Sequence, residues 1–146
     1  MKHKVYKNYT SILPSWQTIL EDLELNLVEG SMVKHLDNLG FVTHRGERIP
    51  SVDILRRTIH ALHPDKSECT AHIYISLLAC SKTFGRHKDD TDVFFIQALG
   101  QTKWVIEENG EHEYILSPGD MIFIPKEHWH NPTPLSPRVG ISIGFN

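Results

Sequence analysis

The spacing of apolar residues changes near the middle of the chain. Up to residue 66, apolar positions recur every three or four residues, as they do on a helix with one buried face. From Ala71 onward, short apolar and β-branched runs alternate with turn residues, as they do in a series of strands. This pattern predicts a helical or irregular segment over residues 1–66 and a β core over residues 67–146.

Helices are expected in the first segment. Their apolar stripes occupy residues 16–27, 32–39 and 54–62. Gly40 is a typical helix stop, and Ser51 is a suitable N-cap for the last helix. The stretch 41–50 is interpreted as a loop with room for a short strand.

Six strands are expected in the β core, at residues 71–79, 93–99, 104–107, 113–116, 121–124 and 139–145. Asn109-Gly110 between two of them is a strong hairpin-turn signal. Many short strands separated by turns are typical of a barrel or jelly roll rather than of a parallel sheet. We therefore expect a mainly β fold with the N-terminal helices packed on its outer face. A further edge strand from before residue 66 stays open.

Length and charge limit the classes of protein that fit. At 146 residues, the chain is expected to form a single domain, residues 1–146, around one core. The net charge of −3 argues against nucleic acid as a partner, because phosphate neutralisation needs a basic face. No apolar run reaches the roughly 18 residues of a membrane span, and the N-terminus lacks a secretory signal. A cytoplasmic protein is expected, with Cys69 and Cys80 as free thiols.

Two histidines and an aspartate form the most informative polar pattern. His87 and Asp89 are two residues apart, and His130 follows 41 residues after the aspartate. Two imidazoles and one carboxylate are the ligand set of the facial triad that holds non-haem Fe(II) and leaves the opposite positions open. Residues two apart on an extended strand point to the same side, so His87 and Asp89 can reach one ion. Asp90 would point away in that geometry, whereas His128 competes with His130 as the third ligand.

The order of motifs around these residues resembles the cupin-fold oxygenases of the Jumonji-C type, which are non-haem iron enzymes that hydroxylate protein side chains and related substrates. The shared pattern has His-x-Asp, a Phe-rich strand that contains Gln, Pro-Gly-Asp, and a His five residues beyond Ile-Pro. In this chain these motifs lie at residues 87–89, 93–100, 118–120 and 124–130. The resemblance covers residues 71–146, which is half of the chain.

The resemblance implies both a fold and a chemistry. The fold is a cupin-type double-stranded β-helix, a form of jelly roll, and the interval of five residues from Pro125 favours His130 over His128 as the third ligand. His87, Asp89 and His130 are then the catalytic ligands of Fe(II), with 2-oxoglutarate as co-substrate and dioxygen as oxidant. The implied substrate is a small molecule or the side chain of a peptide or protein, and a homodimer stays open.

The chain departs from the family where the co-substrate binds. Oxygenases of this type hold the distal carboxylate of 2-oxoglutarate with Lys or Arg, and the corresponding position here is Thr102. Lys103 is adjacent, but strand alternation turns it to the other face. We therefore expect Arg138 to be the anchor, since a guanidinium binds a carboxylate through two hydrogen bonds. Lys103 is the second candidate, and Thr102 and Tyr74 are expected to assist through their hydroxyl groups.

Two other classes of protein remain possible, and Thr102 is the best support for the first. One is a metal-dependent cupin that does not use 2-oxoglutarate, such as a small-molecule dioxygenase or isomerase. The other is a non-catalytic binding cupin, against which the complete set of His87, Asp89 and His130 counts.

Overall fold

The computed structural model describes residues 1–29, 33–79 and 81–145. Within these ranges it contains two α-helices, one short 3-10 helix and ten strands. In chain order they are β1 (Lys4–Tyr6), α1 (Trp16–Glu29), β2 (Val33–Leu36), β3 (Gly40–Thr43), η1 (Gly46–Arg48), α2 (Pro50–Ala61), β4 (Cys69–Ser76), β5 (Val93–Leu99), β6 (Thr102–Glu107), β7 (Glu111–Leu116), β8 (Met121–Ile124), β9 (His130–Pro134) and β10 (Arg138–Phe145).

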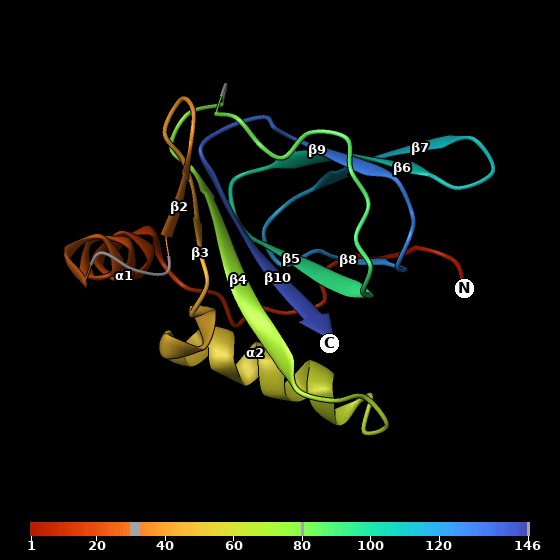
Figure 1. Ribbon diagram of the computed structural model, residues 1–146, viewed down its shortest axis with the longest axis horizontal. Helices are drawn as coiled ribbons and strands as arrows, with labels where there is room; N and C mark the ends of the chain where they lie inside the picture. Colours follow the sequence, from red (N-terminus) through yellow and green to blue (C-terminus); the bar gives the residue numbers. More distant parts are fainter. Residues whose placement is uncertain (30–32, 80, 146) are drawn as a thin grey trace.

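The strands form two antiparallel sheets that pack against each other (Figure 1). The large sheet has the order β1-β8-β5-β10-β4-β3-β2, and the small sheet has the order β7-β6-β9. Side chains of both sheets meet in one buried apolar cluster, which comprises Phe95, Ile122 and Ile124 from the large sheet and Trp104, Ile106 and Leu116 from the small sheet. Two sheets enclosing a shared interior are the architecture of a jelly roll. The predicted mainly β fold is confirmed.

Helices α1 and α2 cover the other face of the large sheet. Ile19 and Leu23 of α1, together with Val52, Leu55 and Ile59 of α2, join the buried cluster that includes alternate residues of β4, β5 and β10. Figure 1 shows both helices on the side of the large sheet that faces away from β6, β7 and β9. The predicted position of the helices on the outer face is therefore confirmed, and the space between the two sheets is left for the site.

The N-terminal segment contains strands in addition to the expected helices. β2 occupies part of the stretch that we predicted as a helix ending at Gly40, and that prediction is wrong. Positive φ angles at Asn38 (57°) and Leu39 (59°) close a hairpin between β2 and β3, and β3 pairs with β4. Pairing with the large sheet therefore outweighs the helical spacing of the apolar residues. Met32, the first residue of the predicted helix, lies outside the described residues.

Both edge strands of the large sheet, β1 and β2, come from before residue 66. The sequence analysis allows for one such strand. The description of residues 1–66 as helical or irregular is therefore incomplete, because β1, β2 and β3 extend the sheet that the later strands begin.

Two further element boundaries differ from the prediction. α2 begins at Pro50, and its N-cap is Ile49 rather than Ser51, because the fixed φ of proline suits the first helical position. β9 was not predicted, since it contains Pro132 and Pro134, which have no N–H to donate to a strand partner. It is accommodated at an edge of the small sheet, where prolines are tolerated.

The expected state of the thiols is confirmed for one cysteine. Cys69 is buried and free, whereas Cys80 lies outside the described residues. Neither α1 nor α2 has the combination of length and hydropathy that a membrane-spanning helix needs.

Candidate metal centre

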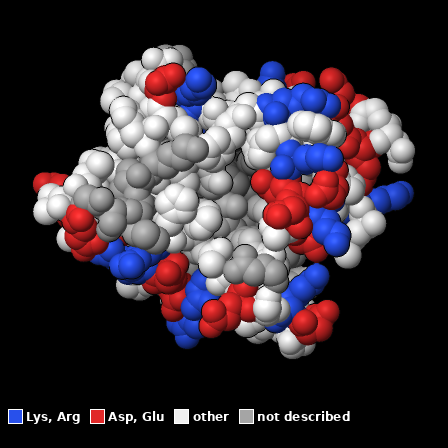
Figure 2. All heavy atoms as spheres, viewed as in Figure 1, with Lys and Arg blue, Asp and Glu red and all other residues white. Residues whose placement is uncertain are grey.

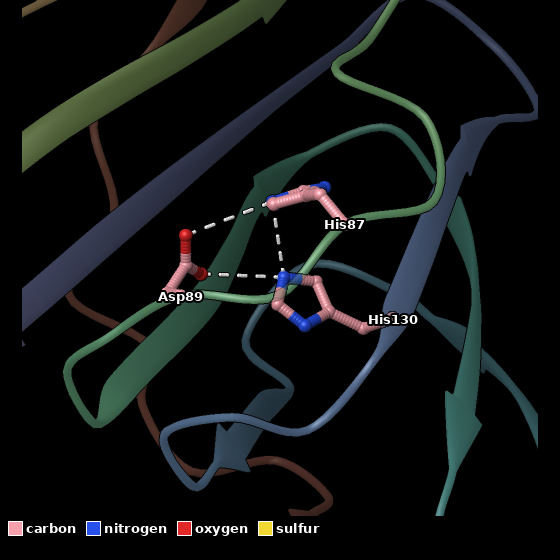
Figure 3. A group of neighbouring side chains, drawn as sticks. All are labelled: His87, Asp89 and His130. Atoms are coloured by element: carbon pink, nitrogen blue, oxygen red, sulfur yellow. Dashed lines mark hydrogen bonds and ion pairs between the residues drawn. The ribbon is translucent and has the colours of Figure 1, made fainter.

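His87, Asp89 and His130 meet where the loop between β4 and β5 passes the start of β9 (Figures 1 and 3). His87 and Asp89 lie in this loop and not on a strand, so the same-side rule for extended strands does not explain their convergence. The backbone does. His87 N donates to His130 O at 2.9 Å, and His130 N donates to His87 O at 2.8 Å. Glu127 N donates to Asp89 O at 2.7 Å. These main-chain hydrogen bonds bring the three side chains close together.

The three side chains have the spacing of ligands around one ion. Nε2 of His130 lies 3.1 Å from Nε2 of His87 and 3.3 Å from Oδ2 of Asp89. Nε2 of His87 lies 3.9 Å from Oδ1 of Asp89 (Figure 3). Ligand atoms at roughly 2.1 Å from a divalent metal and at right angles to each other are about 3 Å apart. The two distances from His130 are close to this value, and the distance between His87 and Asp89 is longer, so the group could hold a metal ion at neighbouring positions.

The hydrogen bonds of the two rings decide which nitrogen faces this point. Nδ1 of His87 donates to Gly85 O at 2.8 Å, and Nδ1 of His130 donates to His128 O at 2.8 Å. A carbonyl oxygen only accepts, so each Nδ1 carries the proton and each Nε2 presents a lone pair to its neighbours. Histidines that bind metals are oriented in this way by backbone carbonyls. Two lone pairs and a carboxylate at one point require a cation between them.

The hydrogen bond from His130 holds the pKa of Asp89 below its ordinary value, and it outweighs the opposing effect of burial. Asp89 is therefore a carboxylate at neutral pH and is available as a ligand.

A cavity lies beside the three residues, and its empty space amounts to about 410 Å³ when it is counted to the open mouth. The rest of its wall is formed by Tyr74, Thr83, Phe84, Val93, Phe95, Trp104, Ile124, Pro132, Arg138 and Ser142. Charged side chains of both signs gather on the side of the molecule that carries β6 and β7, while uncharged atoms cover much of the middle of this face (Figure 2). A small polar molecule bound here would be held among mostly apolar groups.

Arg138 is a buried cation in the wall of this cavity. Its side chain opens β10, and the residue is only 2% exposed. Nε donates to Ser76 Oγ at 2.9 Å, whereas Nη1 is buried without a partner among the described residues. Burial lowers the pKa of Arg138 to about 10, against a smaller opposing effect of Tyr74. The guanidinium remains charged at neutral pH, and a donor of this kind is costly to leave unpaired.

Of the three other residues expected at the co-substrate site, one lines the cavity and two do not. Tyr74 lines the cavity with Arg138, and burial, with the nearby Asp89 charge, raises the pKa of Tyr74 to about 12. Its hydroxyl group is thus a hydrogen-bond donor at neutral pH. Thr102 is fully buried, and its hydroxyl has no partner among the described residues. Neither Thr102 nor Lys103 is among the described residues that line the cavity, and the alternating burial of β6 turns Lys103 away from the interior.

Trp104 and Phe95 are not among the site residues expected from the sequence, yet both line the cavity. The Nε1–H group of Trp104 is buried and has no hydrogen-bond partner in the described part of the chain. The period of β6 could have indicated this, because Trp104 lies two residues after Thr102 and shares its inward face.

The two competing ligand candidates point elsewhere. The ring of His128 faces Glu108, with Nε2 at 2.9 Å from Oε1. Asp90 is exposed to solvent, and it does not belong to the group of described residues whose ligand atoms converge. The geometry thus favours His130 and Asp89.

Comparisons with known proteins agree with this geometry. A family model of the JmjC domain matches residues 50–113 and 106–146, which together span most of the β core. No curated protein sequence matches the chain.

Among solved structures, YcfD, a ribosomal oxygenase from Escherichia coli, in complex with cobalt and 2-oxoglutarate, superposes with a TM-score of 0.76 and 20% identity, covering 99% of this chain and 48% of that chain. A Pseudomonas putida prolyl-4-hydroxylase superposes with a TM-score of 0.71 and 10% identity, covering 99% and 92%. The chain therefore spans about half the length of the YcfD structures that it matches.

Proposed function

The chain belongs to the JmjC domain family, and from this premise we propose that it is an Fe(II)- and 2-oxoglutarate-dependent oxygenase. The observation that carries the proposal is the pairing of two features in one cavity. The His87, Asp89 and His130 group has the spacing of metal ligands. The same wall holds the buried guanidinium of Arg138, whose Nη1 has no hydrogen-bond partner among the residues that the structure describes. A metal ion suits the first feature, and the carboxylate of a ligand suits the second.

His87, Asp89 and His130 would hold Fe(II) on one face and leave the opposite positions open. When bound, Fe(II) supplies the activation of dioxygen, while the oxidation of 2-oxoglutarate to succinate and carbon dioxide accompanies hydroxylation of the substrate. The protein's own part is to orient and to exclude water. The carbonyls of Gly85 and His128 fix the two imidazole rings, and the apolar wall keeps bulk solvent away.

Arg138 would bind the distal carboxylate of 2-oxoglutarate. Its Nε is already held by Ser76, which leaves the outer guanidinium nitrogens to face the ligand. The Tyr74 hydroxyl lies in the same wall and would add one further hydrogen bond. Because a buried charge without a partner is unfavourable by several kcal/mol, an anion that completes this site is stabilised by more than an exposed pair would be. Thr102 and Lys103 are the weaker candidates for this role, since neither lines the cavity.

The substrate proposed is the side chain of a protein or peptide, or else a small molecule. The first choice follows from the likeness to a ribosomal oxygenase and a prolyl-4-hydroxylase, which is a likeness of fold. The half-exposed ring of Phe84 at the cavity wall offers an incoming group an apolar surface next to His87.

Anaerobic titration tests the proposal directly. Protein loaded with Fe(II) is titrated with 2-oxoglutarate, and the weak visible charge-transfer band of the chelate is followed. A saturable band with one site per chain is expected. Iron binding without such a band would contradict the use of 2-oxoglutarate. It would favour the alternative of a metal-dependent cupin acting on another small molecule, for which the uncharged Thr102 at the usual cation position is the specific observation.

A further inference from the structure

The turn that precedes His130 is strained, and its backbone holds two of the three metal-site residues. Glu127 has a φ of +64°, which is a left-handed conformation that non-glycine residues rarely adopt. Its N–H donates to Asp89 O at 2.7 Å, and the next N–H, that of His128, donates to Pro125 O at 3.3 Å. A strained conformation persists only where surrounding contacts determine it. Contacts with neighbouring residues must therefore stabilise this turn.

His128 connects the turn to the metal site on one side and to the neighbouring hairpin on the other. Its carbonyl oxygen accepts the hydrogen bond from Nδ1 of His130 at 2.8 Å. Figure 3 shows that this nitrogen lies on the side of the ring away from His87. The side chain of His128 donates from Nε2 to Oε1 of Glu108 at 2.9 Å. The position of Glu108 therefore affects the position of the carbonyl that orients His130.

Glu108 is itself fixed from several directions. It follows β6 at the hairpin turn, and its side chain is 15% exposed. Oε2 accepts a hydrogen bond from Nδ1 of His3 at 2.7 Å, and Oε1 accepts one from the backbone N of His3 at 3.2 Å. The other ring nitrogen of His3 lies 2.7 Å from the hydroxyl of Tyr114. Burial raises the pKa of Glu108, but the hydrogen bonds from His128 and His3 outweigh it and lower the pKa overall, so the group accepts as a carboxylate.

We propose that Glu108 is a positioning residue of the metal centre, which orients His130 through His128 and is itself held by His3. The proposal rests on the metal site of the proposed function. The contacts form a continuous path from the segment before β1, through the hairpin between β6 and β7, to a metal ligand. Partners of this kind, one step removed from the ligands, commonly change metal affinity by 10- to 100-fold when they are replaced.

Co(II) titration of the full chain tests this proposal. The Kd is measured from the visible ligand-field bands for the wild type, Glu108→Gln and the control Glu111→Gln, which changes an exposed carboxylate of the same hairpin. The glutamine has the size of Glu108 but offers one acceptor oxygen to two imidazole donors. We expect Glu108→Gln to raise the Kd by about tenfold or more and to change the shape of the bands. Glu111→Gln should match the wild type, and His3→Ala should show a smaller loss in the same direction.

Each other result counts against the proposal. If Glu108→Gln lowers the Tm of the metal-free protein but leaves the Kd and the bands unchanged, Glu108 only stabilises the hairpin. If Glu111→Gln loses affinity equally, the cause is surface charge. If Glu108→Gln does not fold, His3→Ala decides, and an unchanged Kd there overturns the role of His3. Wild-type protein that binds no Co(II) overturns this proposal and the metal site of the proposed function together, whereas the other results leave the proposed function intact.

Discussion

Replacement of Arg138 by methionine is expected to separate co-substrate binding from folding stability. Methionine fills a similar volume without a charge. In the wild type, burial lowers the pKa of Arg138 well below its ordinary value, to about 10. At about 1.4 kcal/mol for each pH unit, this shift corresponds to a cost of about 3 kcal/mol for holding the buried charge in the folded, ligand-free protein.

Arg138→Met is expected to weaken the binding of 2-oxoglutarate but to keep or raise the stability of the metal-free protein. A bound carboxylate offsets the cost of the buried charge, so Arg138→Met should weaken 2-oxoglutarate binding by about 3 kcal/mol, which is on the order of a hundredfold in Kd. The metal-free variant should unfold at the same or a higher temperature, because replacing a poorly paired buried charge by an apolar side chain is often stabilising by about 1–4 kcal/mol. The loss of the bond to Ser76 reduces this gain.

The assay is the anaerobic titration of iron-loaded protein, combined with calorimetric unfolding of the metal-free form. Lys103→Met is the matched control, since Lys103 is a nearby cation that does not line the cavity. Arg138→Lys should recover only part of the affinity, because a point charge cannot reproduce the guanidinium fork. Equal affinity in the wild type and in Arg138→Met would eliminate Arg138 as the anchor, and a loss confined to Lys103→Met would transfer the role to that residue.

Two further pairs of substitutions test the metal site and the interior between the sheets. Asp89→Ala should abolish Co(II) binding and leave the far-ultraviolet circular dichroism unchanged, while Asp90→Ala should bind normally; the reverse outcome would show that the ligand assignment is wrong. Gly140→Ala should lower the Tm strongly, because a Cβ there would lie 1.8 Å from Cζ of Phe95, whereas Gly144→Ala on the same strand, where the nearest atom is 3.9 Å away, should be tolerated. Similar Tm values for the two variants would refute this account of the interior.

The strands and the helices on the outer face could be predicted where the spacing of apolar residues and the length of the segment indicate the same type of element. Residues 93–99 and 121–124 were predicted with the bounds that the structure has for β5 and β8. β2 was missed because its helical spacing is a local property, whereas the hairpin that it forms with β3 is held in the sheet by β4, which comes only after α2. The same limit applies to β9, whose prolines hid a strand that exists only at the edge of a sheet.

The ligand group could be predicted because its residue types and motif order are informative, although the geometric reason given for it is wrong. His87 and Asp89 converge through backbone contacts with His130 and Glu127 and not through strand alternation. The contact between His128 and Glu108 joins residues 20 positions apart, and no local period encodes it. The burial of Arg138 likewise depends on how the two sheets close over β10.

The pairing of β1 with β8 has a consequence for the synthesis of the protein. These strands align Val5 with Ile122, so a ribosome makes more than one hundred residues between them. At about 5–20 residues per second, β1 stays without its partner for on the order of 5 to 20 seconds. From its own synthesis until β8 follows it, β5 also has an unpaired edge, since β8 lies between it and β1, and such edges recruit strands from other chains. His3 lies next to β1 and reaches Glu108 only when the N-terminal segment docks, so the proposed support of His130 forms late in the folding of a nascent chain.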